Sequence, residues 1–192
     1  MQGARGIKTI LIALNELLEA DGTQTALSDF HCALDLDIET FLQSKAIDFN
    51  RRNLCRTYLI LDAEAFAKNI IRIEAYFTLS IKSLRSDLDS MSKTNIKKIS
   101  GRTTADTLNF VLIGQLGKRI DIVDGKPVGS KVSGNEILDY AFETICLIDE
   151  MIPCKAVLVE CSDNENVRRI YENYGFKFFQ NDGAHNQYIK IL

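Results

Sequence analysis

Residues 157–176 read VLVECSDNENVRRIYENYGF and predict three successive elements. The apolar, β-branched run over residues 156–160 is typical of a buried strand, and the polar turn after it is typical of a loop. Asn164, Val167 and Tyr171 follow at helical spacing, and Gly175 ends the predicted helix. Residues 176–179 and 187–191 then close the chain as a β-hairpin. This order of strand, helix and hairpin is the strongest structural signal in the sequence.

The segment before this stretch supplies another strand and a long helix. Residues 108–116 form an apolar run that predicts a strand, and residues 134–152 predict a helix that Pro153 closes. Between them lies a predicted loop with turn-forming residues at Gly117, Gly125, Pro127 and Gly129. A strand, loop, helix and strand in this order makes the two strands parallel neighbours. We therefore predict an α/β fold with a mixed, mostly antiparallel sheet, one parallel strand pair at its centre, and flanking helices.

The first residues predict an amphipathic helix. Apolar side chains from Ile7 to Leu18 recur at helical spacing, and Asp21-Gly22 follows them as a helix stop. Its apolar face would pack on the rest of the protein, or serve a partner or a second copy of the chain. We expect this N-terminal helix within residues 1–22, as part of or appended to a single domain over residues 23–192.

Helical and strand periodicities alternate after this segment. Residues 37–52 predict a second helix, whereas residues 57–61 and 70–81 have a period of two and predict an antiparallel strand pair. The polar stretch that follows contains a short predicted helix, with Ser92 as its N-cap and Gly101 as its stop.

The composition fits one soluble domain. The 192 residues include 23 Lys or Arg and 26 Asp or Glu, for a formal net charge of −3, which argues against a uniformly basic nucleic-acid binder. The five cysteines form no Cys-x-x-Cys pair, so we expect reduced thiols, and no residues show metal-ligand spacing. The first long apolar run is far below the ~20 residues that span a bilayer. We therefore expect a cytoplasmic protein with no membrane partner and no metal.

The C-terminal stretch carries a recognisable residue pattern. Asn164, Ile170-Tyr171-Glu172 and Gly175-Phe176 resemble the last motif of the Gcn5-related N-acetyltransferases, the GNAT superfamily. Further landmarks are similar to the bacterial GNAT branch that includes tRNA-acetylating toxins: Ser28-Asp29-Phe30-His31-Cys32, Arg56-Thr57-Tyr58, Tyr76-Phe77-Thr78-Leu79-Ser80 and Leu112-Ile113-Gly114-Gln115-Leu116. The resemblance covers most of the chain after the first helix and implies an acyltransferase of the N-acetyltransferase type.

The resemblance also implies acetyl-coenzyme A as the co-substrate. The pyrophosphate loop of the family falls on residues 129–134, where the first position and the middle glycine of its pattern are lost, so this loop is degenerate. Backbone N–H groups at the helix start can still hold phosphates. The implied cofactor-binding residues are Gln115, Leu116, Gly117, Lys118, Lys126, Lys131, Ser133, Gly134, Asn135 and Asn164.

The implied reaction is the direct attack of a primary amine on the thioester in a ternary complex. A backbone N–H within residues 115–117 would face the thioester oxygen and stabilise the charge that develops there. Tyr171 would donate a proton to the departing thiolate, with Tyr174 as its rival. The general base stays open among Glu160, Asp106 and a water relay. His31, His185 and Cys161 are expected to be structural or surface residues.

Three interpretations of the function stay open. The leading acceptor is the aminoacyl group of charged tRNA, which would make the protein a growth-inhibiting toxin with an antitoxin as a partner. A protein or small-molecule amine is the second acceptor class. A catalytically degenerate acyl-CoA-binding or regulatory module is the third interpretation, because the phosphate loop is altered. A homodimer is a further possible assembly.

The charges are unevenly distributed along the chain. Residues 93–131 hold eight basic and three acidic residues, whereas residues 132–163 hold seven acidic residues and one lysine. The basic block leads into the proposed phosphate loop. It could therefore meet coenzyme A phosphates, an RNA backbone or both.

Overall fold

The computed structural model describes residues 8–85 and 93–192. The chain divides into two compact units. Unit 1 comprises the described residues up to Thr78 together with Gln115–Tyr140, and unit 2 comprises the described residues of Leu79–Gly114 together with Ala141–Leu192. The domain boundary expected after residue 22 stays a prediction.

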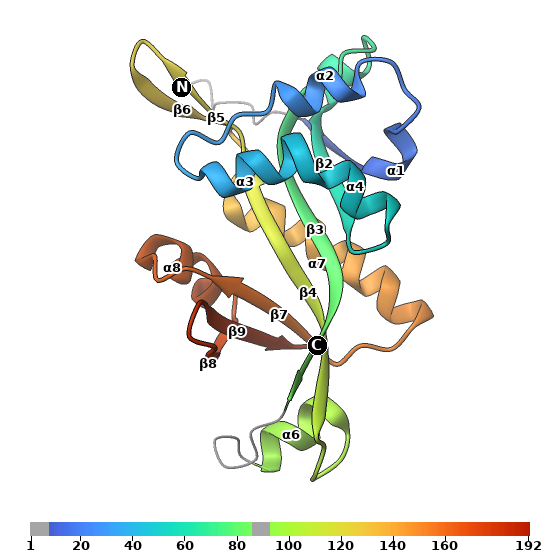
Figure 1. The fold of residues 1–192 in the computed structure, drawn as a ribbon, viewed down its shortest axis with the longest axis vertical. Helices are drawn as coiled ribbons and strands as arrows, with labels where there is room; N and C mark the ends of the chain where they lie inside the picture. The colour runs from blue at the N-terminus through green and yellow to red at the C-terminus, as the bar shows by residue number, and fades with distance from the viewer. Residues whose placement is uncertain (1–7, 86–92) are drawn as a thin grey trace, which may run out of the picture. The chain divides into compact units, whose positions relative to one another are not determined.

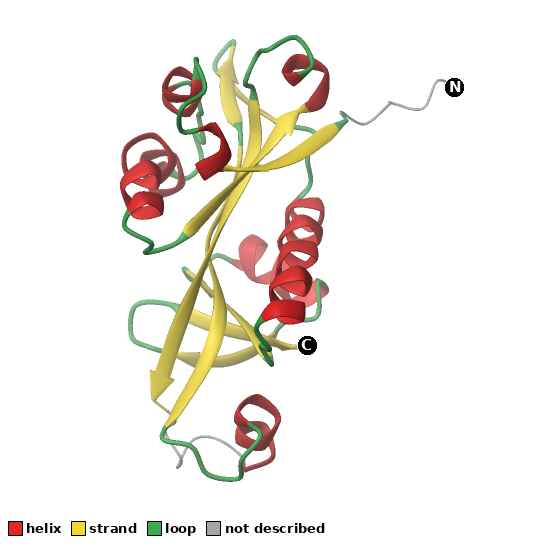
Figure 2. Ribbon diagram, turned by 90° about the vertical axis from the view of Figure 1, so that its right-hand side faces the viewer, coloured by secondary structure: helices red, strands yellow, loops and turns green. Residues whose placement is uncertain are grey.

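Seven strands form one sheet in the order β1-β2-β3-β4-β7-β9-β8 (Figure 1, Figure 2). β4 and β7 are parallel, with residues 111–113 opposite residues 157–159, whereas β1 with β2, β7 with β9, and β8 with β9 are antiparallel. The predicted mixed sheet with a parallel pair is therefore confirmed. The strands are β1 (Thr9–Ala13), β2 (Arg56–Asp62), β3 (Ile73–Arg85), β4 (Thr107–Lys118), β7 (Ala156–Cys161), β8 (Lys177–Asn181) and β9 (Asn186–Ile191).

The helices over 134–152 and 164–174 form as the sequence predicts, and the helix over 37–52 forms with a π-helical turn, η1, in its middle. The short helix before Gly101 also forms, and Gly101 stops it with a φ of 79°. Its predicted N-cap, Ser92, lies outside the described residues. The helices are α1 (Leu14–Leu17), α2 (Thr23–Ser28), α3 (Leu36–Thr40), η1 (Phe41–Lys45), α4 (Ala46–Arg51), α5 (Ala63–Phe66), α6 (Lys93–Ser100), α7 (Gly134–Met151) and α8 (Glu165–Asn173).

The first apolar segment differs from the prediction. Thr9–Ala13 is the strand β1, so the predicted amphipathic helix is wrong over residues 9–13. Within residues 8–21, the part of this segment that the structure describes, only Leu14–Leu17 is helical. β1 pairs with β2 along its whole length. A short apolar run with β-branched residues does not distinguish a strand from a helix by periodicity alone. The distant partner strand decides the conformation.

The predicted loop after β4 also differs, because it contains a β-hairpin. β5 (Ile120–Val123) pairs with β6 (Lys126–Gly129) through a turn at Asp124 and Gly125, whose φ angles are 51° and 73°. Two positive φ angles define the type I′ turn that Asp-Gly favours. The residues of β6 are exposed, and the hairpin extends from unit 1 (Figure 1).

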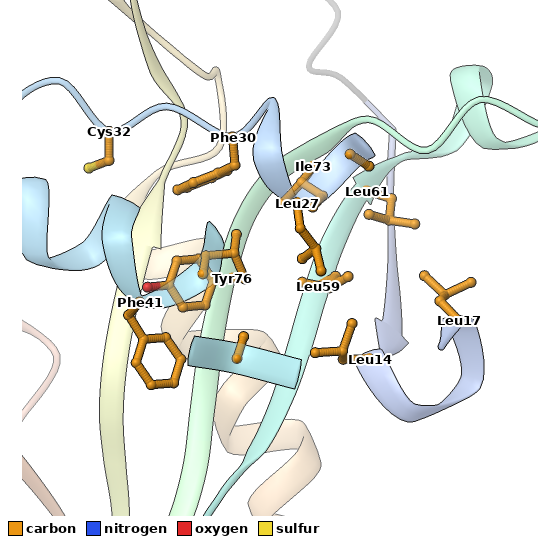
Figure 3. Close-up of a cluster of buried hydrophobic side chains, with 13 residues drawn as sticks. Leu14, Leu17, Leu27, Phe30, Cys32, Phe41, Leu59, Leu61, Ile73 and Tyr76 are labelled. Carbon is orange, nitrogen blue, oxygen red and sulfur yellow. The ribbon is translucent and has the colours of Figure 1, made fainter. Parts of the chain in front are cut away.

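The core of unit 1 packs α2, η1 and α4 against β2 and β3 (Figure 3). Tyr76 of β3 is fully buried in it, with its ring edge-on to Phe30 at 5.5 Å and stacked on Phe41 at 6.3 Å. The Tyr76 hydroxyl donates to the Ile38 carbonyl at 2.7 Å. Each fully buried large side chain stabilises the folded state by about 1.5–3 kcal/mol. This cluster therefore holds in place the helices that flank the end of β4.

A separate core cluster in unit 2 holds α6 on the sheet. Ile96 and Ile99 of α6 pack with residues of β4, β7 and β9. The strand residues of this cluster are Leu108, Phe110, Ala156, Leu158 and Ile189.

Candidate active site

The end of β4 lies in unit 1, where its neighbours restrict the backbone. The register with β7 ends at Ile113, and β4 continues to Lys118. The Gln115 N–H donates to Thr78 Oγ1 at 2.9 Å. Gly117 is buried, and a Cβ there would collide with Ile38 Cγ2 of α3. Within the predicted oxyanion segment the Gln115 N–H is thus engaged by the protein, which leaves Leu116 and Gly117 as the candidates.

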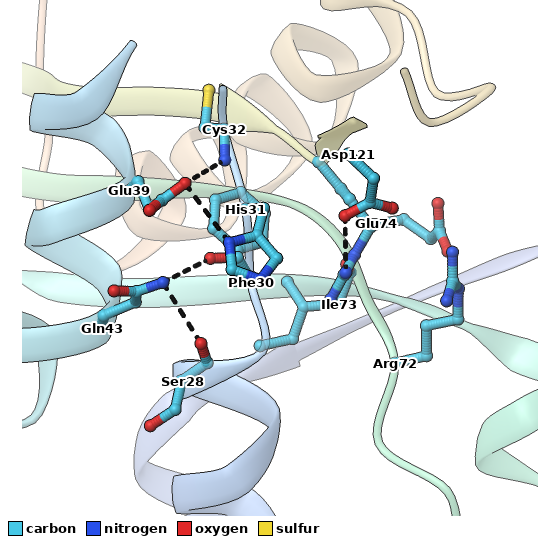
Figure 4. A network of polar contacts seen from close by, with 11 residues as sticks. Ser28, Phe30, His31, Cys32, Glu39, Gln43, Arg72, Ile73, Glu74 and Asp121 are labelled. Atoms are coloured by element: carbon cyan, nitrogen blue, oxygen red, sulfur yellow. Dashed lines mark hydrogen bonds and ion pairs between the residues drawn. The ribbon is translucent and has the colours of Figure 1, made fainter. Parts of the chain in front are cut away.

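The Ser28–Cys32 landmark lies beside α3 and β5 in unit 1 (Figure 4). Glu39 accepts the Cys32 N–H at 2.7 Å, and its carboxylate lies 3.6 Å from His31 Nδ1. Gln43 donates to the Ser28 and Phe30 carbonyls. Burial, followed by the nearby Asp35, raises the pKa of the Cys32 thiol to about 11. These contacts give the segment a structural role and leave His31 exposed at the surface.

The basic residues of unit 1 differ in how accessible they are. Arg119 is buried: its Nε donates to the Ile73 carbonyl at 2.9 Å, and its Nη1 pairs with Asp121 at 3.1 Å. The Lys118 ammonium lies 3.6 Å from the position that a Cβ on Gly129 would take. Lys118 is therefore close to the start of the predicted phosphate loop, whereas Arg119 is a structural residue.

Two exposed lysines occupy different places along the hairpin and the loop. Lys131 lies shortly before α7 and is exposed. Lys126 is also exposed and starts β6, about 10 Å along the strand from Gly129 at ~3.3 Å per residue. Lys131 is thus the better placed of the two for a ligand at the start of α7.

A reciprocal capping box closes the start of α7. Ser133 N–H donates to Glu136 Oε2 at 2.7 Å, and Glu136 N–H donates to Ser133 Oγ at 3.2 Å. The hydrogen bond from the Ser133 backbone N–H, followed by one from the Ser133 side chain, holds the pKa of the Glu136 carboxyl below its usual value. Gly134 and Asn135 follow at the first helical positions, where backbone N–H groups lack intrahelical acceptors. The predicted phosphate-binding helix start therefore carries its own carboxylate.

Val132 does not obstruct this helix start from outside. An outward-pointing Cβ at this position would crowd a ligand that needs close backbone approach. The side chain is instead only 3% exposed and belongs to the buried core. Val132, which stands where the family pattern has a glycine, thus leaves the backbone at Ser133 and Gly134 accessible.

Asn164 caps α8 in unit 2. Its side-chain Oδ1 accepts the N–H groups of Asn166 at 3.0 Å and Val167 at 3.4 Å. This cap accounts for asparagine at this position in physical terms, because a short polar side chain satisfies the free donors of the first turn. A role as a ligand of the pantetheine arm stays a prediction.

Tyr171 points into the interior of unit 2. It is 7% exposed and packs edge-on against Phe176 at 5.7 Å. Burial, followed by the neighbouring Cys161, raises the pKa of its phenol above the ordinary value. The phenol is protonated at physiological pH, and the raised pKa makes it a weaker acid than an ordinary tyrosine.

The rival Tyr174 is engaged differently. Its ring packs on Phe142 at 5.3 Å, Lys190 Nζ lies 4.3 Å from the ring centroid, and Lys190 also donates to the Tyr174 carbonyl. These contacts explain Tyr174 as a packing residue, so Tyr171 remains the better candidate for the acid.

Glu160, one candidate for the general base, is bound on both carboxylate oxygens. Lys82 Nζ lies 2.6 and 2.7 Å from them, and Gln187 Nε2 donates to Oε1 at 2.5 Å. Lys82 on β3 reaches past β4 to Glu160 on β7. Asp106, the second candidate, is exposed in unit 2. The sequence carries no signal of the Lys82–Glu160 pair because 78 residues separate its members.

The predicted site residues fall into two groups. Residues 115–118, 126, 131 and 133–135 all belong to unit 1, and Asn164 and Tyr171 belong to unit 2. Among the described residues, no group of His, Cys, Asp or Glu is arranged to hold a metal ion. In the same residues, no helix is both long and apolar enough to cross a membrane.

The sheet order, with a parallel β4–β7 pair followed by α8 and the β8–β9 hairpin, agrees with the fold that the sequence resemblance to the Gcn5-related N-acetyltransferases implies. Solved structures with this fold that match the chain include those of the toxin AtaT and of KacT. AtaT complexed with acetyl-methionyl-tRNAfMet is 16% identical, with a TM-score of 0.69, over 96% of this chain and 95% of that chain. A tyrosine-to-phenylalanine mutant of KacT is 18% identical, with a TM-score of 0.70, over the same shares of the two chains.

A third match is an AtaT mutant toxin bound to the C-terminus of the antitoxin AtaR and acetyl-CoA. It is 15% identical, with a TM-score of 0.65, over 95% of this chain and 92% of that chain. No protein-family model matches the sequence, and no curated protein matches it. At these identities the likeness establishes the fold.

Proposed function

We propose that the protein is an N-acetyltransferase that transfers an acetyl group from acetyl-coenzyme A to the amino group of charged tRNA and thereby acts as a toxin. The fold shared with AtaT and KacT over nearly the whole chain carries this proposal. Structures of AtaT contain acetyl-CoA or acetyl-methionyl-tRNAfMet. Among the acceptor classes that the sequence leaves open, these neighbours favour aminoacyl-tRNA.

The residues of unit 1 suit a phosphate-bearing co-substrate. The N–H groups of Gly134 and Asn135 head α7, and Lys118 and Lys131 lie at the loop before it. A helix start combines free donors with a positive dipole end, which favours phosphate binding. The end of β4 at Leu116 and Lys118 would pair with the amides of the pantetheine arm, as an added strand would.

Acetyl-coenzyme A, when bound, supplies the activated thioester, and the protein supports its cleavage. The acceptor nitrogen forms a bond to the carbonyl carbon while the carbon–sulfur bond breaks and its electron pair goes to sulfur. A backbone N–H of Leu116 or Gly117 stabilises the carbonyl oxygen. Tyr171 gives its proton to the thiolate. We assign the amine proton to a water relay, because Lys82 and Gln187 already bind the Glu160 carboxylate.

Exposed cations are available for an RNA acceptor in each unit. Lys93, Lys97 and Lys98 are exposed on α6 of unit 2, and Lys126 and Lys131 are exposed in unit 1. The basic block of the sequence is thus split between the units, and its buried member Arg119 contributes nothing to either surface. An antitoxin partner, a homodimer and a cytoplasmic location belong to the same proposal.

Two measurements test the proposal in order. Calorimetric titration with acetyl-coenzyme A should show saturable binding, and no heat at high ligand concentration would leave only a catalytically degenerate module. Induced expression in bacteria should then arrest growth, whereas equal expression of Tyr171→Phe should not. Normal growth with soluble, cofactor-binding wild-type protein would contradict the toxin role and favour a protein or small-molecule acceptor.

A further inference from the structure

A groove of about 650 Å³ lies within unit 2, where β4 begins. One wall comes from the end of α6 and the segment after it, and the other comes from the last turns of α7 and the chain leading to β7. The acetyl-transfer proposal assigns no role to this groove. Its apolar lining consists mainly of Ile81, Ile99, Phe110, Ile148 and Ile152.

Apolar side chains continue from the groove onto the open surface. Ile81 is 79% exposed and Ile152 is 70% exposed, although both are large aliphatic residues. Leu147 and Met151 are also exposed and lie on α7 beside the groove-lining Ile148 and Ile152. Large aliphatic residues that gather around a hollow, rather than being scattered singly, are typical of a surface that binds another molecule.

Positive charge frames this apolar surface. Arg102 and Lys155 are the charged residues that line the groove, and the structure describes no carboxylate among its lining residues. The Lys155 ammonium lies near Gly101, at the end of α6, where Lys97 and Lys98 are exposed. The nearby Asp149 carboxylate accepts the Cys154 N–H at 2.7 Å. A ligand in the groove would therefore meet aliphatic walls and the cationic side chains of Arg102 and Lys155.

We propose that this groove is the docking site for an acidic segment of a partner protein, whose aliphatic side chains fill the groove and whose carboxylates face Arg102 and Lys155. Charge complementarity selects an acidic occupant. The lining selects a peptide over RNA, because single-stranded bases bind by stacking on exposed aromatic rings, and the aromatic lining residue Phe110 is only 2% exposed. The inference does not depend on acetyl transfer.

The test uses fluorescence polarisation with the full-length protein and no acetyl-coenzyme A. The probes are a fluorescein-labelled helical peptide of alternating Leu and Glu clusters, the same peptide with Lys in place of every Glu, and a labelled single-stranded RNA. The groove variants are Ile152→Asp, Ile81→Asp and Lys155→Glu. Ile70→Asp and Lys68→Glu in the β2–β3 connection are matched controls, because Ile70 is 57% exposed and Lys68 is also at the surface.

We expect the acidic peptide to bind wild type and to bind each groove variant at least tenfold more weakly. The control variants should bind it with the wild-type affinity, and the basic peptide should not bind. Loss of binding in both Ile152→Asp and Ile81→Asp, with unchanged thermal melting, excludes local unfolding of α7 as the cause. No binding by wild type, or equal binding by groove and control variants, overturns the proposal. It is also overturned if only RNA binding responds to the groove variants. Sedimentation in which wild type is a dimer and Ile152→Asp a monomer would assign the face to a second copy instead.

Discussion

Replacing Glu136 with glutamine should strengthen the binding of acetyl-coenzyme A. The carboxylate lies 2.7 Å from the Ser133 amide nitrogen, so it occupies a donor that a phosphate oxygen would use at the start of α7. A phosphate that binds there must approach or displace a like charge. Two unit charges 4 Å apart repel by about 1 kcal/mol in water and about 4 kcal/mol at the surface of a protein. Because Glu136 is exposed, we expect about 1–2 kcal/mol, or roughly 5- to 30-fold in Kd.

The Glu136→Gln substitution should also cause a small loss of stability. Glutamine keeps a weaker acceptor for the Ser133 N–H, so the substitution should destabilise the fold by about 0.5–1 kcal/mol. The Ser133 hydrogen bonds lower the folded-state pKa of Glu136. The stabilisation by its carboxylate is therefore full above the ordinary pKa of about 4.3 and is lost as the pH falls through the lowered value. Wild type and variant should thus converge in stability as the pH falls below this lowered pKa.

The assay is calorimetric titration of wild type, Glu136→Gln and Glu143→Gln with acetyl-coenzyme A at low salt. Glu143 is an exposed carboxylate further along α7 and serves as the matched control for net charge. The gain in affinity of Glu136→Gln for acetyl-coenzyme A should be smaller at high salt, because added ions screen exposed charges. Equal Kd values for wild type and Glu136→Gln would show that the Glu136 carboxylate does not oppose phosphate binding, and so would an equal gain in affinity in Glu143→Gln.

Four further substitutions test other residues of the candidate site and of the sheet. Tyr171→Phe should lower turnover by about 100-fold and leave acetyl-coenzyme A affinity unchanged, measured by steady-state kinetics and calorimetry; retained turnover would place the acid elsewhere. Gly117→Ala should destabilise the protein by about 1–3 kcal/mol in urea unfolding, because its Cβ meets Ile38, and Ile38→Ala in the same chain should recover part of the loss. Lys82→Met should cost about 1–3 kcal/mol by leaving the Glu160 carboxylate with Gln187 alone, and Lys82→Met with Glu160→Gln should cost less than the single change. Asn164→Ala should cost about 1 kcal/mol through loss of the α8 cap, whereas Asn173→Ala at the other end of α8 should cost less.

The sequence predicts best where local pattern and tertiary environment agree. The strand over 156–160, the helix after Asn164 and the closing hairpin each combine a periodic apolar pattern with a cap or a turn, and all of them form. The segment over 9–13 fails because its apolar run fits either conformation, and pairing with β2 decides for a strand.

The candidate site likewise contains some contacts that a local sequence pattern indicates and others that it does not. Ser133-x-x-Glu136 is a capping-box pattern that the sequence displays, yet its consequence appears only when the helix start is also the predicted phosphate site. The engagement of the Gln115 N–H by Thr78, and of Glu160 by Lys82, depends on strand neighbours far apart in the chain. Such non-local pairs leave no periodic signal in one sequence.

The most direct test of acetyl transfer to charged tRNA is mass spectrometry of the products. Purified protein is incubated with acetyl-coenzyme A and a mixture of aminoacylated tRNAs, cellular proteins and metabolites, with Tyr171→Phe as the control. We expect an acetyl group on the amino group of aminoacyl-tRNA, formed by wild type and at a much lower rate by the variant. Acetylation confined to proteins or small amines, or none in any fraction despite saturating acetyl-coenzyme A, would contradict it.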